Sequence, residues 1–140
     1  MKRIILTIIT ALWMGVIFFL SSEDSIKSTK LSDSFTDKTL VSVCKLFNKN
    51  CDKDKVISKY GMIIRKGAHF TEYFILGTLM FFTLREYGIK GIWIPILICV
   101  FYASTDELHQ LFVAGRSARI LDLIIDSCGS TLAILLFNHF

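Results

Sequence analysis

The stretch RKGAHFTEYFILG, residues 65–77, joins two features that seldom occur together. Its second half is apolar, as at the start of a membrane-spanning helix, whereas its first half carries Arg65, Lys66, His69 and Glu72. Ionisable side chains are costly inside a bilayer and are kept where they pair with one another or line a wet site. The stretch therefore predicts a membrane helix that brings a polar site to one end.

The composition of the whole chain indicates a membrane protein. The 140 residues are 53% hydrophobic and include one proline, whereas a soluble domain of this size keeps more of its surface polar. The apolar residues gather in four runs, at 4–20, 70–84, 92–103 and 120–137. We expect one all-α domain over residues 1–140, a four-transmembrane-helix up-down bundle. Its helices are expected at about 4–22, 64–85, 91–112 and 118–138.

The apolar runs are short for membrane spans, and the residues that would complete them are polar. A helix needs roughly 20 residues to cross ~30 Å of hydrocarbon. The run at 92–103 must therefore continue through Asp106, Glu107 and Gln110, and the run at 70–84 must include His69. In an up-down bundle these polar ends lie at the same membrane face, so the sequence predicts one site built from several helices.

Helical spacing aligns the polar residues of each expected helix. Residues four and seven apart lie on one helix face. Three such faces are formed by Arg65, His69 and Glu72, by Asp106 and Gln110, and by Asp122, Asp126 and Gly129. The small residue at 129 would let a neighbouring helix approach closely beneath the two carboxylates.

A long loop, residues 23–63, is expected between the first two helices. Within it, residues 40–47 have the spacing of a short amphipathic helix, which either lies on the bilayer or caps the bundle. The sequence leaves open whether Cys44 and Cys51 form a disulfide. Cys99 and Cys128 lie in apolar runs and are expected to be small core residues.

The net charge of +4 arises mainly from basic residues in and beside this loop. Such charge suits an anionic membrane surface or envelope polymer. No nucleic-acid-binding signature accompanies it, so we expect membrane lipids and not nucleic acid as partners.

The signals for orientation conflict. Most Lys and Arg residues lie on the side of the long loop, which favours a cytoplasmic loop. Lys2 and Arg3 precede the first apolar run and Glu23 and Asp24 follow it, which favours the reverse. Because the first helix usually dominates and no small-residue cleavage site follows it, we predict an uncleaved anchor. Both termini would then be cytoplasmic and the polar site would face outward.

Three segments that follow a first helix ending in Ser21-Ser22 resemble the VanZ-like family. They are RKGAHFTEYFILG, DELHQLFVAGR and DLIIDSCGS, in that order. The family is named for a teicoplanin-resistance protein, and the resemblance extends over roughly Phe18–Ala133 apart from the long loop. It implies a small integral membrane protein of the bacterial cell envelope. Some members of the family lower susceptibility to glycopeptide or lipoglycopeptide antibiotics.

The resemblance also implies particular site residues. The matching positions are Lys66, His69, Glu72, Tyr73, Asp106, Glu107, Gln110, Arg116, Asp122 and Gly129. Ala114 stands where the family often has proline, Asp126 where it often has asparagine, and Ala133 where it often has glycine. The additional carboxylate at 126 means that the family's hydrogen bonds need not recur in this chain.

We expect these positions to form a ligand site that holds no metal or cofactor. The expected site residues are Arg65, Lys66, His69, Glu72, Tyr73, Asp106, Glu107, Gln110, Arg116, Asp122 and Asp126. The cations would contact the phosphate of an anionic lipid head group or cell-wall precursor, because Arg binds phosphate in bidentate fashion. The carboxylates would orient those cations.

Other interpretations of the same residues stay open. Ion pairs of Arg116 with Asp106 or Asp122, and of Arg65 with Glu72, could serve only to hold the bundle together. The site could instead belong to a membrane enzyme that acts on a lipid or polyprenyl phosphate. His69 or Glu72 would then be the general base and Asp106 the acid. A proton-coupled carrier is disfavoured because four short helices show no internal repeat.

The predicted orientation can be tested by labelling cysteines in intact cells. After mild reduction, a membrane-impermeant maleimide is expected to label the chain through Cys44 and Cys51. A variant with both cysteines changed to serine retains Cys99 and Cys128 and is the control. Labelling that appears only after permeabilisation would place the loop and the polar site in the cytoplasm.

Overall fold

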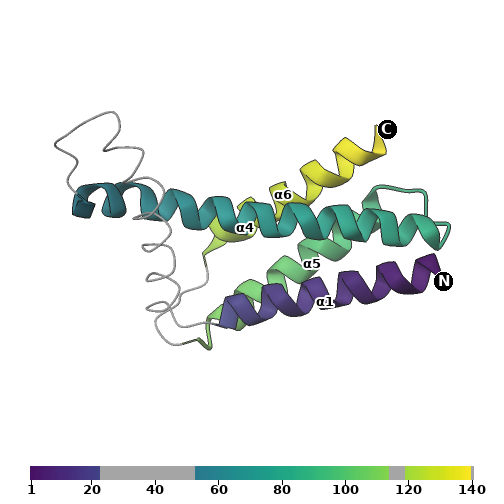
Figure 1. Cartoon of the computed structure of the whole chain (residues 1–140), viewed down its shortest axis with the longest axis horizontal. Helices are drawn as coiled ribbons and strands as arrows, with labels where there is room; N and C mark the ends of the chain where they lie inside the picture. The colour runs from purple at the N-terminus through teal and green to yellow at the C-terminus, as the bar shows by residue number, and fades with distance from the viewer. Residues whose placement is uncertain (23–52, 114–118, 140) are drawn as a thin grey trace.

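The structure, a computed structural model, describes residues 1–22, 53–113 and 119–139, except for the side chains of 53–62, 64 and 65. Within these residues the fold is all-α, as the sequence predicts. It has four helices, α1 (Lys2–Ser22), α4 (Lys53–Glu86), α5 (Trp93–Gln110) and α6 (Ile120–Asn138). Consecutive helices run in opposite directions, and both termini lie at the same end of the molecule (Figure 1).

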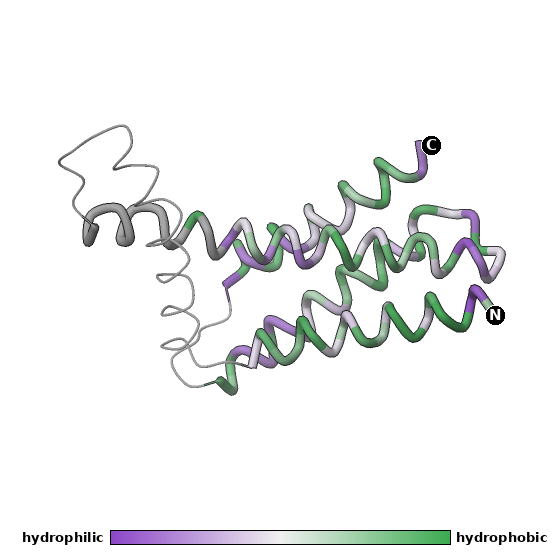
Figure 2. Tube along the Cα trace, in the orientation of Figure 1, coloured by the Kyte–Doolittle hydropathy of each residue, from purple (hydrophilic) through white to green (hydrophobic). Residues whose placement is uncertain are grey.

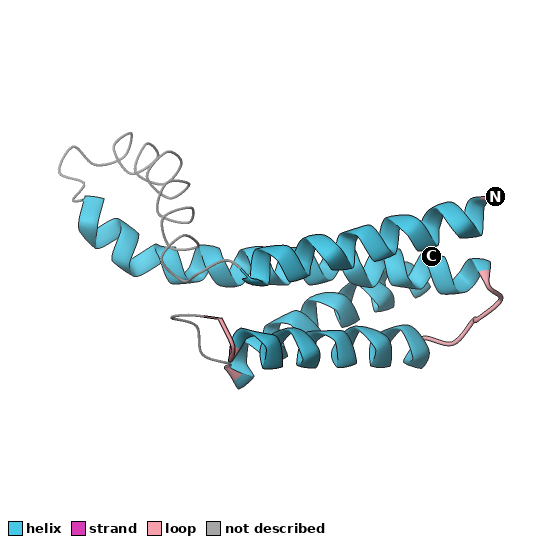
Figure 3. Ribbon diagram, turned by 90° about the horizontal axis from the view of Figure 1, so that it is seen from below, coloured by secondary structure: helices cyan, strands magenta, loops and turns pink. Residues whose placement is uncertain are grey.

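The long helix α4 is the centre of the arrangement. It packs against α1, α5 and α6, and α5 also contacts α1 and α6. Among the described residues α1 and α6 do not contact each other, and α4 runs between them in Figure 1. Figure 3 shows the first turns of α4 extending past the other helices. The positions of α1 and α6 are therefore set largely by their contacts with α4, whereas α5 packs more extensively against α6 than against α4.

The beginning of α4 corrects the predicted loop. The helix begins at Lys53 and not near residue 64, so the last part of the expected loop 23–63 is helical. Its sequence, KDKVISKYGMII, contains no proline, and elongating a formed helix is favourable for such residues. At 1.5 Å per residue α4 is about 51 Å long, and its first turns extend beyond the bundle (Figure 1). The predicted helix at 40–47 and the pair Cys44 and Cys51 lie outside the described residues.

The end of α4 is fixed by a glycine turn. The Gly88 N–H donates to the Arg85 carbonyl and the Ile89 N–H donates to the Leu84 carbonyl, both at 3.0 Å. This is the Schellman pattern, which needs a left-handed residue after the helix. Gly88 supplies it with φ of +84°, and the chain then turns back into α5.

The surface of the described helices is largely apolar. Large aliphatic and aromatic side chains of α1, α5 and α6 are exposed, and they include Ile5, Leu12, Phe19, Leu97, Phe101, Leu121, Ile124 and Leu135. Polar side chains such as Thr10, Asp106 and Asp126 are buried instead. Figure 2 shows α1 as mostly hydrophobic along its length. This distribution is the reverse of that in a soluble protein.

Two of the described helices, α1 and α6, are long and apolar enough to cross a membrane. Four such spans were expected. The structure confirms the all-α fold but supports only two of the four as candidate spans. The polar residues at the end of α5 and within α4 account for the difference. Cys99 is buried, as expected, whereas Cys128 lies exposed on α6 and is not a core residue.

The contact between α4 and α6 depends on two glycines. A Cβ atom added at Gly77 would lie 2.4 Å from the Ser130 carbonyl oxygen, and one at Gly129 would lie 2.5 Å from the Phe70 carbonyl oxygen. Both distances are too short for any side chain, and both neighbours are backbone. The predicted close approach at Gly129 is therefore confirmed, and Gly77 is a second crossing point that the sequence reasoning missed.

Substituting these glycines is expected to separate α4 from α6. Gly77→Ala and Gly129→Ala should each destabilise the protein by about 1–3 kcal/mol, because the backbone must move to accept a methyl group. Gly15→Ala is the matched control, since nothing lies within 4 Å of its added Cβ, and alanine should be neutral or slightly stabilising there. Unfolding titrations in detergent micelles measure all three. Equal stabilities would contradict the close packing.

Candidate functional site

Polar side chains from α4 and α6 meet at the end of the bundle opposite the termini. His69 Nδ1 lies 3.9 Å from Asp126 Oδ1 and 4.0 Å from Glu72 Oε2. Glu72 lies one turn after His69 on α4, whereas Asp126 comes from the facing side of α6. His69 is thus positioned between a carboxylate of its own helix and one of the neighbouring helix.

Helix α5 contributes Asp106, whose side chain is almost completely buried at 2% exposure. Ser21, Tyr73 and Gln110 are its polar neighbours, and His69 is near enough to act on it electrostatically. None of these neighbours completes a hydrogen bond to either carboxylate oxygen in the part of the chain that the structure describes. Ser21, Tyr73 and Gln110 come from three different helices, so Asp106 lies where α1, α4 and α5 converge.

Asp126 is completely buried and is surrounded by other acids. Asp106, Glu107, Asp122 and Glu72 all lie near enough to repel a charge on it. Glu107 has a structural contact as well, because its Oε2 accepts a hydrogen bond of 2.9 Å from the Arg119 backbone N–H. That bond holds the start of α6 against the end of α5.

The basic residues of the predicted site are less completely described. Lys66 is partly buried on α4, close in sequence to His69. Arg65 belongs to α4 by its backbone, but its side chain is not described, and Arg116 lies outside the described residues. The predicted ion pairs of these two arginines are therefore untested. We shall call Glu72, Asp106, Glu107, Asp122 and Asp126, with His69 and Tyr73, the carboxylate cluster.

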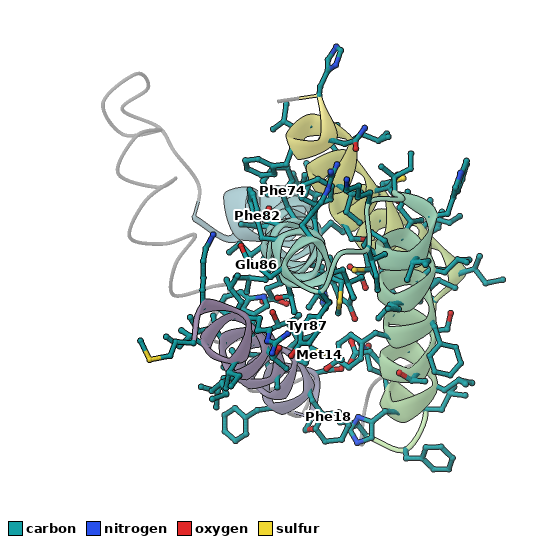
Figure 4. The ribbon with its side chains drawn as sticks, turned by 90° about the vertical axis from the view of Figure 1, so that its right-hand side faces the viewer. Met14, Phe18, Phe74, Phe82, Glu86 and Tyr87 are labelled. Atoms are coloured by element: carbon teal, nitrogen blue, oxygen red, sulfur yellow. The ribbon has the colours of Figure 1, made fainter. Side chains whose placement is uncertain are left out.

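Three contacts of α1 and α5 near the cluster were not predicted from the sequence. Trp13 Nε1 donates to the Glu72 carbonyl at 3.0 Å, and the Tyr102 hydroxyl donates to the Met14 carbonyl at 2.6 Å. The rings of Phe18 and His109 pack with centroids 4.3 Å apart. Figure 4 shows Met14 and Phe18 on the side of α1 that faces α5. The sequence feature that could have indicated these contacts is the presence of aromatic residues one to two turns before the polar end of each helix.

No three His, Cys, Asp or Glu side chains among the described residues converge in a way that could hold a metal ion. The cluster is better described as buried carboxylates with one imidazole, one phenol and neighbouring Ser21 and Gln110. Such groups can accept hydrogen bonds, attract a cation or exchange protons.

The fold and the cluster define a class of small all-α proteins with an apolar exterior and ionisable side chains buried at one end. Compared with known families, the sequence matches that of VanZ/LLP1 over residues 6–140, nearly the whole chain. The chain therefore belongs to the VanZ/LLP1 family, and the resemblance of its ordered segments is confirmed. Membership in this family indicates a membrane-associated protein. No curated protein and no solved structure matched the chain.

The proximity of His69 and Asp126 can be measured with a double-mutant cycle. His69→Gln and Asp126→Asn keep the approximate shape of each side chain, and we expect their effects on unfolding to be coupled by about 0.5–3 kcal/mol. His139→Gln at the other end of the bundle is the control, and with Asp126→Asn it should be additive within about 0.5 kcal/mol. Additive effects for the first pair would contradict the observed contact.

Proposed function

We propose that the protein is a multi-pass membrane protein of the bacterial cell envelope that binds an anionic lipid head group or cell-wall precursor. All four helices would cross or enter the bilayer, with both termini cytoplasmic and the carboxylate cluster toward the outer face. Occupation of that site would alter susceptibility to glycopeptide or lipoglycopeptide antibiotics. The observation that carries the proposal is the reversed distribution of polarity, with charged groups buried at one end and apolar groups exposed.

Helix α5 shows this reversal most clearly. Its outward side chains Trp93, Leu97 and Phe101 are 71%, 65% and 73% exposed, whereas Asp106 and Glu107 are 2% and 5% exposed. Exposing the first set to water would be unfavourable, and exposing the second set to lipid would cost still more. Both costs are avoided if lipid surrounds α5 and the polar residues face inward.

The position of Lys66 supports a phosphate-bearing ligand. It lies on α4 between the overhanging first turns and His69, at the same end as the carboxylate cluster. Its ammonium group can extend toward the interface, because long basic side chains place their charge near head groups. Arg65 and Arg116, which the sequence places at this end, would complete the phosphate contacts.

An enzymatic role is the second candidate. The observation that favours it is the placement of His69 between Glu72 and Asp126, because a carboxylate can orient an imidazole that acts as a general base. Asp106, on the facing helix, would be the acid. In this case the bound lipid or polyprenyl phosphate would be a substrate.

Phosphate recognition can be tested by native mass spectrometry of the protein in detergent micelles. Phosphatidylglycerol is expected to bind, whereas diacylglycerol, which lacks the phosphate, is not. Lys66→Gln should weaken phosphatidylglycerol binding by roughly tenfold, the usual effect of losing one charged hydrogen bond. Lys90→Gln, at the opposite end of the bundle, is the matched control and should bind as the wild type does.

Two outcomes would change this proposal. Equal binding of the two lipids, or no effect of Lys66→Gln, would contradict phosphate recognition. Release of a head group by the wild type, lost in His69→Gln, would favour the enzyme. Antibiotic susceptibility of cells that express each variant at normal levels then shows whether the same residue acts in the envelope.

A further inference from the structure

The carboxylate cluster groups several acids around one described imidazole. Asp126 lies near four other acids, and His69 is the described base that reaches both it and Asp106. Lys66 is partly buried at the same end of the bundle, and Arg119 meets Glu107 through its backbone N–H. The phosphate of a ligand bound at Lys66 would not itself contact these acids, because like charges repel more strongly where water is excluded.

Several buried polar atoms of the cluster also point to a missing partner. Tyr73 is completely buried, and its hydroxyl lies beside Asp106 and Asp126 without completing a hydrogen bond in the described structure. The same holds for Ser21 Oγ and Gln110 Nε2 near Asp106, and for both oxygens of Asp126. Buried polar atoms are nearly always hydrogen-bonded in folded proteins. This group of atoms therefore has the composition of a binding position for a small polar group.

From these two observations we infer that Asp106, Asp126 and Tyr73 bind the primary ammonium group of the ligand whose phosphate contacts Lys66. An ammonium group has a positive charge and three N–H donors. Two carboxylates and a phenolic oxygen from three helices can accept those three donors. The inference rests on the proposed function and adds the ligand class: an amphiphile that carries both a phosphate and a primary amine.

The position of the carboxylate cluster in the bundle allows an ammonium group to reach it from outside. Ser21 lies in the last turn of α1, Gln110 is the last residue of α5, and Asp122 is in the first turn of α6. The cluster therefore lies near the helix ends and not at the middle of the bundle. A head group can enter from that face while its acyl or prenyl chains remain against the apolar exterior.

Trp13 provides a local probe of this position, because its indole N–H is bonded to the Glu72 carbonyl. The chain has two tryptophans, so Trp93→Phe leaves Trp13 as the only one. In this background, Trp13 fluorescence is titrated with phosphatidylethanolamine and, separately, with phosphatidylcholine. The two lipids share the phosphate and the positive charge, but the choline nitrogen has no N–H.

Phosphatidylethanolamine is expected to bind about tenfold more tightly than phosphatidylcholine, as lost charged hydrogen bonds would require. Asp106→Asn and Asp126→Asn should each remove most of this preference. Glu86→Gln is the matched control, since Glu86 pairs with Lys2 at the opposite end at 2.6 Å. A lipid-anchored lysine peptide and its Nε-acetylated form, titrated in the same way, show whether the amine belongs to a phospholipid or to a cell-wall precursor.

Three results would overturn the inference. The first is equal binding of the two phospholipids together with equal binding of the two peptides. The second is a preference for the primary amine that survives in both asparagine variants. The third is a change in Trp13 fluorescence that Mg²⁺ alone reproduces. Size-exclusion profiles identify a variant that fails to fold, and the wild-type comparison decides the matter even then. If phosphatidylglycerol still binds in a Lys66-dependent way, only the ammonium inference fails. If no phosphate lipid binds, the proposed function fails with it.

Discussion

The close contact of α4 with α6 is the constraint on which the rest of the structure depends. Backbone meets backbone at Gly77 and Gly129, with no space for a side chain at either point. This contact fixes the rotation of both helices, so His69, eight residues before Gly77, and Asp126, three residues before Gly129, are held 3.9 Å apart. Since α4 also contacts α1 and α5, a change in the contact between α4 and α6 would move the helices that surround the carboxylate cluster.

Burying ionisable side chains opposes folding unless other groups stabilise them. In this protein the surrounding groups are polar, but many of them do not bond one another within the described residues. A protein selected only for stability would replace such a cluster with packed apolar residues, which is often neutral or stabilising. The proposed recognition of a ligand would account for the presence of buried acids near the helix ends.

The sequence predicts a large part of this organisation because hydrocarbon restricts where charge can be placed. The helices, their alternating directions and the shared polar end follow from four apolar runs with ionisable residues beside them. The start of α4 at Lys53 could not be predicted, because the propensity of that segment does not distinguish a helix from a solvated loop. Tyr73 was found through its motif, whereas the contacts of Trp13 and Tyr102 depend on helix rotation, which periodicity alone does not fix.

The attachment of α1 has a consequence for biogenesis. Its described polar contacts with the other helices include Thr10 with Thr83, Trp13 with the Glu72 carbonyl, and Tyr102 with the Met14 carbonyl, while its outer surface is apolar. Interhelical hydrogen bonds of this kind associate helices that are already inserted, since lipid supplies no hydrophobic force between them. In the proposed multi-pass topology, the first helix would enter the bilayer by itself and join its partners only after α4 and α5 have emerged, so completion of the cluster would be a late event in synthesis.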